Sequence, residues 1–414
     1  MIPATITGAR AFDIKAALSA RLGALAPNPI TAAMIEAAQL RRQGRMVSDF
    51  SIGEPDFDTP VNIQDAAAKA MRHGATRYTA TDGTPELKQA IGRKFERENR
   101  LRYEPGQITV GSGAKHVIFN ALQATLDPGD EVIVPAPYWT TYPEVVKLCG
   151  GKPVIVDCAR ANGFKLRADQ LAVALSPRTK WIFLNSPSNP TGATYTRDEL
   201  RALADVIVRH PRTLILSDDI YEHFIYTNGG FATIAEVAPE LYDRTLTVNG
   251  ASKTYAMTGW RIGYAGGPAP LIRAIANIQS QATSNPCSIS QAAAVEALDG
   301  PQDYVAEHRE TFRQRRDLVT TLINEIPGLS CDAPDGAFYV YVDCSAIIGK
   351  APPSGVLIAS DLEFTQYLLR EAYVSVVHGA AFGLSPCFRM SYAISELDIA
   401  EGCRRMRDAC AALL

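Results

Sequence analysis

The stretch that decides the fold is TKWIFLNSPSNPTGATYTRDELRALADVIVRHPRTLILSD, residues 179–218. It begins with an apolar run over 179–185 and ends with another over 213–218. Runs that are apolar on both faces are typical of parallel strands covered by helices on two sides. Between them, Thr196 and Glu199 form a capping box that opens a helix. A strand, a helix and a second strand in this order indicate an α/β protein.

Further runs of the same kind lie on both sides of this unit. They are QITV (107–110), DEVIVP (130–135), KPVIVD (152–157), TLTVNG (245–250) and RIGYAGG (261–267). Several are separated by segments long enough for a helix. We therefore predict an α/β fold with one large, mostly parallel sheet flanked by helices.

The pattern changes after about residue 300. Residues 301–326 read as a long, charged amphipathic helix. Short strands are expected around GAFYVYVD (336–343) and AYVSVVHG (372–379), followed by a last helix, which together predict a smaller α+β unit. The predicted division is 1–45 as an N-terminal arm and a helix that packs with the small domain, 46–300 as the large domain, and 301–414 as the small C-terminal domain.

Composition excludes several classes of function. The chain has 414 residues and a net charge of −3, so it lacks the positive field that nucleic acid or an anionic membrane attracts. We expect neither as a partner, and no apolar run is long enough to span a bilayer. The N-terminus lacks the apolar core of a signal peptide, and the eight cysteines form no CxxC pair, which favours a reducing cytoplasm. The six histidines show no metal-binding spacing, so we expect no metal site.

Chemically useful residues follow the predicted strands, where open parallel sheets bind ligands. GSGAKH (111–116) resembles a glycine-rich phosphate loop, but His116 stands where a dinucleotide fingerprint needs glycine. This loop therefore predicts a site for a single phosphate at a helix N-terminus. The residues that follow the other strands are Trp139, Asn185, Asn189, Asp218, Tyr221, Ser252, Lys253 and Arg261.

Each of these residues has an ordinary alternative reading. Lys253 could be a solvated loop lysine, Asp218 a helix cap, Trp139 a core residue and Arg261 half of a surface ion pair. Together they supply an amine, an acid, a phenol, an aromatic plate and a cationic phosphate clamp. Pyridoxal 5′-phosphate needs this combination, with the amine forming a Schiff base and the acid pairing with the pyridinium nitrogen.

The same segments resemble those of a known family. SKTYAMTGWRIGY (252–264), NSPSNPTG (185–192), SDDIYE (217–222), PYWTTYPE (137–144), GEPDFDTP (53–60) and FRMSYA (388–393) are similar to conserved blocks of class I aminotransferases, which are fold type I enzymes dependent on pyridoxal phosphate. The similarity runs from about residue 30 to the end of the chain. It resembles most the bacterial subgroup that is similar to aspartate aminotransferase, and it implies a ping-pong transfer of an amino group between an L-amino acid and a 2-oxo acid.

The resemblance implies a role for each matching residue. Lys253 would form the Schiff base and move the substrate proton. Asp218 would hold the pyridinium nitrogen, Tyr221 and Asn189 would bond the phenolic oxygen, and Trp139 would stack on the ring.

The phosphate and the substrate would have their own partners in this scheme. Ser252, Arg261 and the backbone of Gly113, Ala114 and Lys115 would hold the phosphate. Tyr78 would reach the phosphate of a neighbouring subunit, which implies a homodimer with shared active sites. Arg389 would grip the substrate α-carboxylate, Gly53 would let that carboxylate approach the backbone, and Trp139 and Asn189 would also touch the substrate.

The substrate side chain stays open at this point. One branch of the family uses an arginine for a distal carboxylate where this chain has Ser280, and the resembling subgroup can use a lysine where this chain has Ala26. Aspartate or glutamate is the first expectation, and an aromatic or prephenate-type substrate is the alternative, with Tyr138, Trp139 and Tyr142 as wall or scaffold. Lys115 is either a further cation for the substrate or a solvated helix lysine.

Two other classes share part of this pattern. A lyase or decarboxylase that uses the same cofactor could have Lys253 and Asp218, but Arg389 and the order of the blocks favour amino transfer. A binding protein of this fold that regulates transcription would need a DNA-binding domain, and we expect none because the family's N-terminal helix begins so early in the chain.

Overall fold

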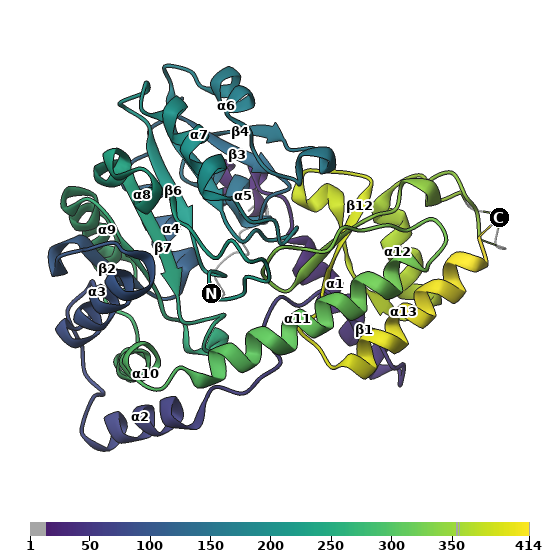
Figure 1. Cartoon of the computed structure of the whole chain (residues 1–414), viewed down its shortest axis with the longest axis horizontal. Coiled ribbons are helices and arrows are strands. Elements are labelled where there is room, and N and C mark those ends of the chain that lie inside the picture. Colours follow the sequence, from purple (N-terminus) through teal and green to yellow (C-terminus); the bar gives the residue numbers. More distant parts are fainter. Residues whose placement is uncertain (1–13, 353–354, 356, 414) are drawn as a thin grey trace, which may run out of the picture.

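One seven-stranded sheet organises the computed structural model, which describes residues 14–352, 355 and 357–413 (Figure 1). Its strands are β2 (Ile108–Gly111), β3 (Glu131–Ala136), β4 (Lys152–Asp157), β5 (Thr179–Asn185), β6 (Leu214–Asp218), β7 (Thr245–Gly250) and β8 (Gly263–Gly266). The order is β2-β8-β7-β6-β5-β3-β4. Only β8 is antiparallel to its neighbours β2 and β7, while β7, β6, β5, β3 and β4 are paired in parallel. The predicted α/β fold with a mostly parallel sheet is confirmed.

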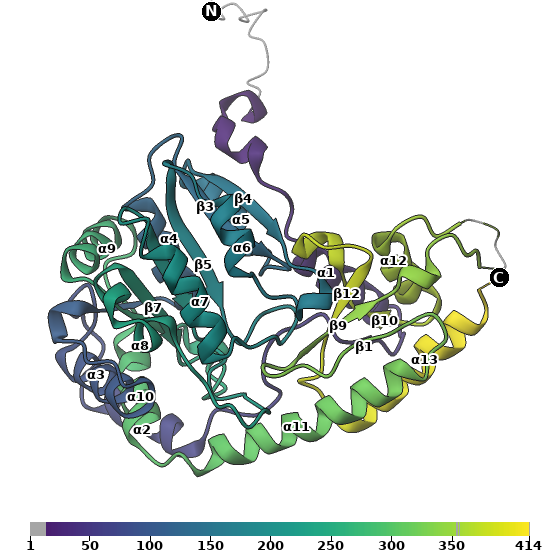
Figure 2. The same ribbon diagram turned by 45° about the horizontal axis from the view of Figure 1, so that its top comes forward.

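Helices cover both faces of this sheet (Figures 1 and 2). They are α4 (Ala114–Gln123), α5 (Thr141–Leu148), α6 (Ala168–Ala174), α7 (Arg197–Ile207), α8 (Ile234–Val237) and α9 (Ala269–Ala282). Successive side chains of a strand point to opposite faces. Accordingly, Val132 and Val134 of β3 pack in one apolar cluster with α4 and α5, whereas Ile133 packs in another with α6 and α7. The strands are apolar on both faces because helices pack against both sides of the sheet.

The capping box at the start of α7 forms as predicted. The Glu199 amide donates to the Thr196 hydroxyl at 3.2 Å, and the Thr196 amide donates to the Glu199 carboxylate at 2.8 Å. The helix ends at Ile207. This helix returns the chain to the start of β6, so that β5 and β6 run in parallel with Asn185 opposite Asp218.

A second helical layer closes the β2 edge of the sheet. It consists of α2 (Val61–Arg72), α3 (Pro85–Asn99) and α10 (Ser288–Asp299). These helices share an apolar cluster with β2 and β8, in which Phe95 of α3 packs edge-on against Tyr264 of β8.

The remaining strands form two small sheets beside the large one. β9 (Tyr339–Asp343), β11 (Val377–His378) and β12 (Cys387–Ser391) are antiparallel, while β1 (Ser48–Asp49) and β10 (Val374–Ser375) pair in parallel. The strands expected near 372–379 are therefore two short ones that belong to different sheets. The helices of this region are α1 (Pro29–Arg42), α11 (Asp303–Asn324), α12 (Asp361–Glu371) and α13 (Glu396–Ala411).

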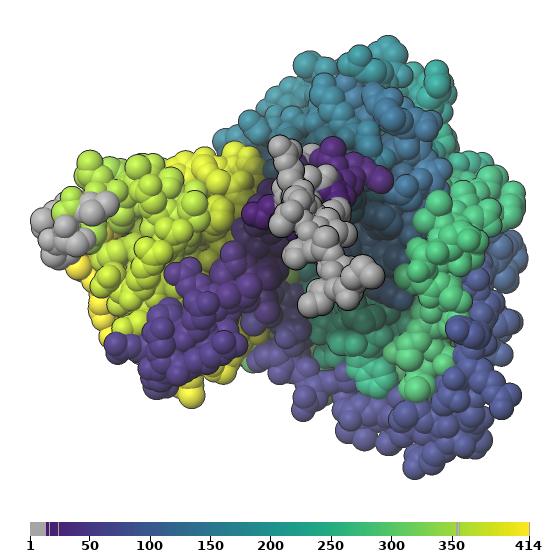
Figure 3. Space-filling view, turned by 180° about the vertical axis from the view of Figure 1, so that it is seen from behind, coloured from purple at the N-terminus to yellow at the C-terminus, as the bar shows by residue number. Residues whose placement is uncertain are grey.

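The N-terminal helix α1 lies with the C-terminal part of the chain, against β10 and β11 (Figure 3). The predicted division at residues 45 and 300 stays a prediction. Short 3₁₀ helices lie at Ile14–Ala17, Ala20–Ala24, Pro105–Gln107, Arg160–Asn162, Pro239–Arg244, Thr258–Trp260, Ser345–Ile347 and Gly379–Phe382. Within the described ranges, no helix combines the length and the apolar character needed to cross a membrane.

Candidate active site

A pocket of about 200 Å³ lies at the carboxyl ends of the central strands. Its walls come from both parts of the chain, since β6, the loop after β7 and the start of α4 face β9 and β12. The lining residues are Ile30, Gly53, Ala114, Lys115, Trp139, Tyr142, Asn185, Asn189, Asp218, Ile220, Tyr221, Ser252, Lys253, Arg261, Tyr339 and Arg389. The pocket therefore gathers most of the site residues predicted from the sequence.

Asp218 ends β6 as a buried carboxylate. The Tyr142 hydroxyl donates to its Oδ2 at 2.6 Å. Burial raises the pKa of Asp218 to about 6, while the hydrogen bonds from Tyr142 and the Ile220 amide oppose this rise. At neutral pH most Asp218 carboxyls are therefore ionised, and a cation beside them would be stabilised.

Asn185 fixes the loop that carries Asn189. Its amide group donates to the Asp218 carbonyl at 2.9 Å, and its carbonyl oxygen accepts from the Asn189 amide at 2.8 Å. These bonds join the ends of β5 and β6 and turn Asn189 toward the pocket. The sequence places Asn185 at the strand end but does not reveal this bridging role.

Lys253 points its amine into the pocket. The amine donates to the Gly53 carbonyl at 2.5 Å and lies 5.9 Å from the ring centres of Tyr221 and Phe338. Burial lowers the pKa of Lys253 to about 8, Glu54 opposes this shift, and the charge of Arg389 adds to it. The alternative of a solvated loop lysine does not fit this position.

The start of α4 forms an anion cradle with Arg261. Gly113 has a φ of 93°, and a Cβ built on it would lie 2.1 Å from Nη2 of Arg261, so glycine is required there. Arg261 donates to the carbonyls of Thr258 at 2.8 Å and Ser112 at 3.4 Å. The first amides of a helix have no partner within it and favour an anion. Ser252 lines the same end of the pocket.

Lys115 leans over Trp139, with its amine 4.8 Å from the ring centre. Burial lowers the pKa of Lys115, and the charge of Arg261 lowers it further. Both residues line the pocket. Lys115 as a whole is exposed, while its amine lies over the Trp139 ring at the pocket wall, so both interpretations left open by the sequence stay open.

Arg389 of β12 is a fully buried guanidinium at the other side of the pocket. It donates to Oδ1 of Asn189 at 3.0 Å and to the Ser51 carbonyl. Its carbon centre lies 4.7 Å from the Tyr339 ring. Its Nε is buried without a hydrogen-bond partner among the described residues. Since a buried donor without a partner is costly, this geometry suits an incoming carboxylate.

Tyr339 is the functional residue that sequence reasoning missed. Its hydroxyl shares a hydrogen bond of 2.8 Å with that of Tyr221 and donates to the Gly53 carbonyl at 3.3 Å. A Cβ on Gly53 would lie 2.4 Å from this hydroxyl, so Gly53 makes room for Tyr339 in this structure. The only signal was its place in the alternating run YVYVD, which does not distinguish a pocket residue from a core residue.

Several residues discussed from the sequence do not line this pocket, among them Gly113 and Tyr138 as well as Tyr78, Ser280 and Ala26. Tyr78 is 90% exposed and does not line the pocket of its own chain. Ser280 is exposed on α9 and donates to the Asn277 carbonyl at 2.7 Å, and the Ala26 amide donates to Glu144 at 2.9 Å. Neither Ser280 nor Ala26 lines the pocket, so neither position supplies a group for a substrate side chain here.

Comparison with known proteins identifies the family. The family described as aminotransferase class I and II matches residues 45–406. Over 396 residues the chain is 56% identical to an aspartate/prephenate aminotransferase of Cereibacter sphaeroides, which covers 96% of this chain and 99% of that protein. The crystal structure of aspartate aminotransferase from Rhizobium meliloti has 53% identity and a TM-score of 0.94, covering 96% of this chain and 99% of that one. Aspartate aminotransferase from Thermus thermophilus with maleate has 42% identity and a TM-score of 0.89, with coverage of 95% and 99%. The chain therefore belongs to the class I and II aminotransferases and is an enzyme of the aspartate aminotransferase type.

Proposed function

We propose that this aminotransferase binds pyridoxal 5′-phosphate in the pocket and transfers the amino group of aspartate or glutamate to a 2-oxo acid. One observation carries the proposal: a lysine amine with a lowered pKa faces the same pocket as a buried carboxylate and an anion cradle. The aspartate aminotransferases of Rhizobium meliloti and Thermus thermophilus support the substrate class by their similarity.

The residues of the pocket fit this cofactor. The cradle at Gly113 and Arg261 suits its phosphate, and the ionised Asp218 suits its ring nitrogen in the protonated form. Tyr221 and Asn189 offer a hydroxyl and an amide for its phenolic oxygen, and Trp139 offers a face for its ring. When bound, the cofactor supplies an aldehyde for the lysine amine and a ring that accepts electrons.

Lys253 would act on the substrate proton. Its lowered pKa leaves a useful fraction of neutral amine near pH 8, which can accept a proton from the substrate Cα and return it elsewhere. Asp218 stabilises positive charge at the ring nitrogen and so favours loss of that proton. Arg389 would orient the substrate by its α-carboxylate, using the Nε that lacks a partner in the described part of the chain. Transfer in two halves, with the 2-oxo acid leaving before the second substrate binds, follows from a single site of this kind.

Lys115 is the residue we propose for the distal carboxylate of the substrate. It is a cation at the pocket wall, with its amine over the Trp139 ring, and neither Ala26 nor Ser280 can replace it because neither lines the pocket. A second candidate substrate is an aromatic or prephenate-type acid, favoured by Trp139 at the wall and by the printed name of the Cereibacter relative.

Replacing Lys115 by Met should separate these substrates. The variant would lose a charge-assisted hydrogen bond to the distal carboxylate, so kcat/KM for aspartate should fall about 10- to 100-fold. The value for phenylalanine should change less than about threefold, because no distal charge is lost. Steady-state kinetics with both amino donors measure this, with Lys180→Met as a matched control away from the pocket. Equal losses for both donors would remove Lys115 from the recognition of the distal carboxylate.

The proposed function is tested by the first half-reaction alone. Single amino acids are mixed with the loaded enzyme, and the absorbance of the bound cofactor is followed without an acceptor. Aspartate and glutamate should each drive one turnover that stops with the aminated cofactor. Continued turnover without an acceptor would indicate a lyase or decarboxylase, and a response confined to aromatic donors would favour the second candidate.

We also propose a homodimer in the cytoplasm. Tyr78 is 90% exposed, and Val61 and Met71 of the neighbouring α2 are exposed apolar residues, which suits a surface covered by a second copy. In that dimer Tyr78 would contribute to the phosphate site of the partner. All eight cysteines are free thiols, which supports a reducing compartment.

A further inference from the structure

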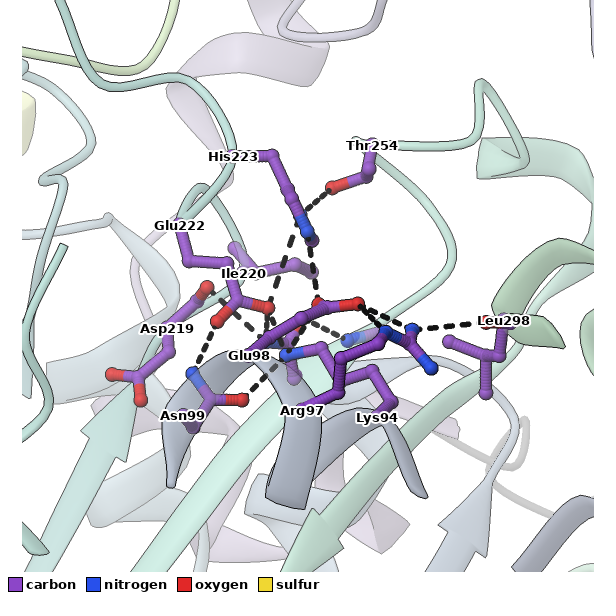
Figure 4. Close-up of polar contacts among 12 residues, drawn as sticks. Lys94, Arg97, Glu98, Asn99, Asp219, Ile220, Glu222, His223, Thr254 and Leu298 are labelled. Carbon is purple, nitrogen blue, oxygen red and sulfur yellow. Dashed lines mark hydrogen bonds and ion pairs between the residues drawn. The ribbon is translucent and has the colours of Figure 1, made fainter. Parts of the chain in front are cut away.

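A cluster of charged and polar side chains lies next to the two loops that carry Tyr221 and Lys253 (Figure 4). Glu222 and His223 directly follow Tyr221, and Thr254 directly follows Lys253. Lys94, Glu98 and Asn99 come from the last two turns of α3, far away in the sequence, and Asn249 comes from β7. No step of the proposed reaction uses any of these side chains, so their presence needs another explanation.

Lys94 is the centre of this positioning cluster, which we define as Lys94, Glu98, Asn99, Glu222, His223, Asn249 and Thr254. The Lys94 side chain has no exposed surface, although lysine is rarely buried. Its amine donates to Oδ1 of Asn99 at 2.7 Å and to Glu222, and it lies 3.5 Å from Glu98. A buried charge of this kind is tolerated only with several partners, so α3 is fixed to the segment after Tyr221.

Glu222 extends the contact to the strand that precedes Lys253. Its Oε1 accepts from Nδ2 of Asn249 at 2.6 Å, and its Oε2 accepts from Nδ2 of Asn99 at 2.5 Å. Asn249 lies in β7, four residues before Lys253. One carboxylate therefore connects α3, β7 and the loop of Tyr221.

His223 connects the cluster to the residue after Lys253. Its Nε2 lies 3.0 Å from Oε2 of Glu98, and its Nδ1 lies 2.9 Å from the Thr254 hydroxyl. Burial raises the pKa of Glu98, but the hydrogen bond from His223 and the charge of Lys94 outweigh it and bring the pKa to about 2. An ionised Glu98 only accepts, so Nε2 carries the hydrogen, and in the neutral ring Nδ1 accepts from the Thr254 hydroxyl.

A metal ion is the other reading of this cluster. Ligand atoms of Glu98, Glu222 and His223 all lie within 4.8 Å of one another. However, the amine of Lys94 already bonds to Glu222 and lies close to Glu98, where it supplies the positive charge that a metal would bring. The Lys94 side chain has no exposed surface, so its amine cannot turn away from these carboxylates toward solvent. Coulomb repulsion therefore disfavours a cation at the same carboxylates.

We propose that the positioning cluster fixes the positions of Tyr221 and Lys253 relative to each other, so that the lysine amine stays directed at the substrate proton. The His223–Thr254 hydrogen bond is the last link in this chain of contacts, because Thr254 is 1% exposed and adjoins Lys253 directly. These residues act through others and do not touch the substrate. This inference rests on the proposed role of Lys253.

The test is a double-mutant cycle with Thr254→Val, His223→Ala and both together. Replacing Lys94 would leave Glu222 buried without its partner and endanger folding, so it is avoided. Loss of one hydrogen bond that aims the amine should lower the rate of the first half-reaction about three- to tenfold with KM changed less than about twofold. The double variant should be no slower than the slower single variant, since both remove the same link.

Thr245→Val is the matched control. Thr245 is buried at the first position of β7, the strand that leads to Lys253, and its hydroxyl donates to the Leu241 carbonyl at 2.8 Å. Both Thr→Val variants should lower Tm by roughly 1–3 °C. Only Thr254→Val should also move the pH at which the bound cofactor changes its absorbance, because only this variant alters the surroundings of Lys253.

The outcomes separate this inference from the proposed function. If the wild-type enzyme binds no cofactor at Lys253, the proposed function fails. If the wild type behaves as proposed but Thr254→Val matches Thr245→Val in rate and in pH profile, the cluster only stabilises the fold and the inference fails. Additive losses in the double variant, or a stoichiometric metal ion in purified protein, would also overturn it.

Discussion

Lys253→Ala is expected to abolish turnover and to leave a folded protein. The variant loses both the amine that holds the cofactor covalently and the group that moves the substrate proton. Proton transfer by a positioned group alone contributes about 10²- to 10⁴-fold, so kcat should fall by at least about ten-thousandfold when both roles are lost. Single-turnover absorbance with aspartate measures the rate.

The fold should survive this change because, within the described part of the chain, the amine makes one hydrogen bond, to the Gly53 carbonyl. Burial also disfavours its charged form, so its removal relieves a cost. Lys180→Ala, at an ion pair with Asp130 outside the pocket, is the control and should keep full activity. Circular dichroism of both variants checks the fold. Even the smallest expected contribution of proton transfer by Lys253 is about 100-fold. A Lys253→Ala variant that keeps more than about a hundredth of the wild-type kcat would therefore contradict the assignment.

Asp218→Asn should give the second largest loss. The change keeps the shape of the side chain but removes its negative charge, which is buried at the end of β6 and hydrogen-bonded to Tyr142. A preorganised charge in such a site is worth about 10²- to 10³-fold in rate. The first half-reaction should slow by at least about 100-fold. The cofactor should still bind, through the anion cradle at Gly113 and Arg261. Rapid-mixing kinetics and equilibrium titration with the cofactor measure the two effects separately.

Asp219→Asn is the matched control for this prediction. Asp219 is the next residue and equally buried, and burial raises its pKa to about 7. It accepts from the Ser217 hydroxyl at 2.7 Å and does not line the pocket. This variant should slow the half-reaction less than about tenfold, since no charge beside the cofactor is lost. Equal losses in the two variants would show that buried charge in general, and not Asp218 in particular, supports the reaction.

The central sheet was predictable because its signals are local. An apolar run such as 179–185 and a capping box such as Thr196 with Glu199 specify an element within a few residues. The direction of β8 was not predictable, because antiparallel and parallel strands have the same composition when both faces are buried. The division of 372–379 between two sheets depends on partners outside this run, the distant Ser48 for β10 and the nearby Arg389 for β11, and the run itself does not specify them.

The site was predictable where a residue ends a strand or lies within a few residues of its end. Asp218 and Lys253 occupy such positions, and the carboxyl ends of parallel strands converge on one edge of the sheet. Tyr142 and Tyr339 enter the pocket from a helix and from another sheet, and only the folded chain brings their hydroxyls to Asp218 and Tyr221. The positioning cluster was likewise hidden, because Lys94 and Glu222 are 128 residues apart and each alone reads as a surface charge.

The most direct test of this account is chemical reduction of the loaded enzyme with borohydride, followed by peptide mapping. The account predicts one covalent cofactor adduct per chain, on the amine of Lys253. Purified and reconstituted protein that stays colourless, or an adduct on any other lysine, would contradict it.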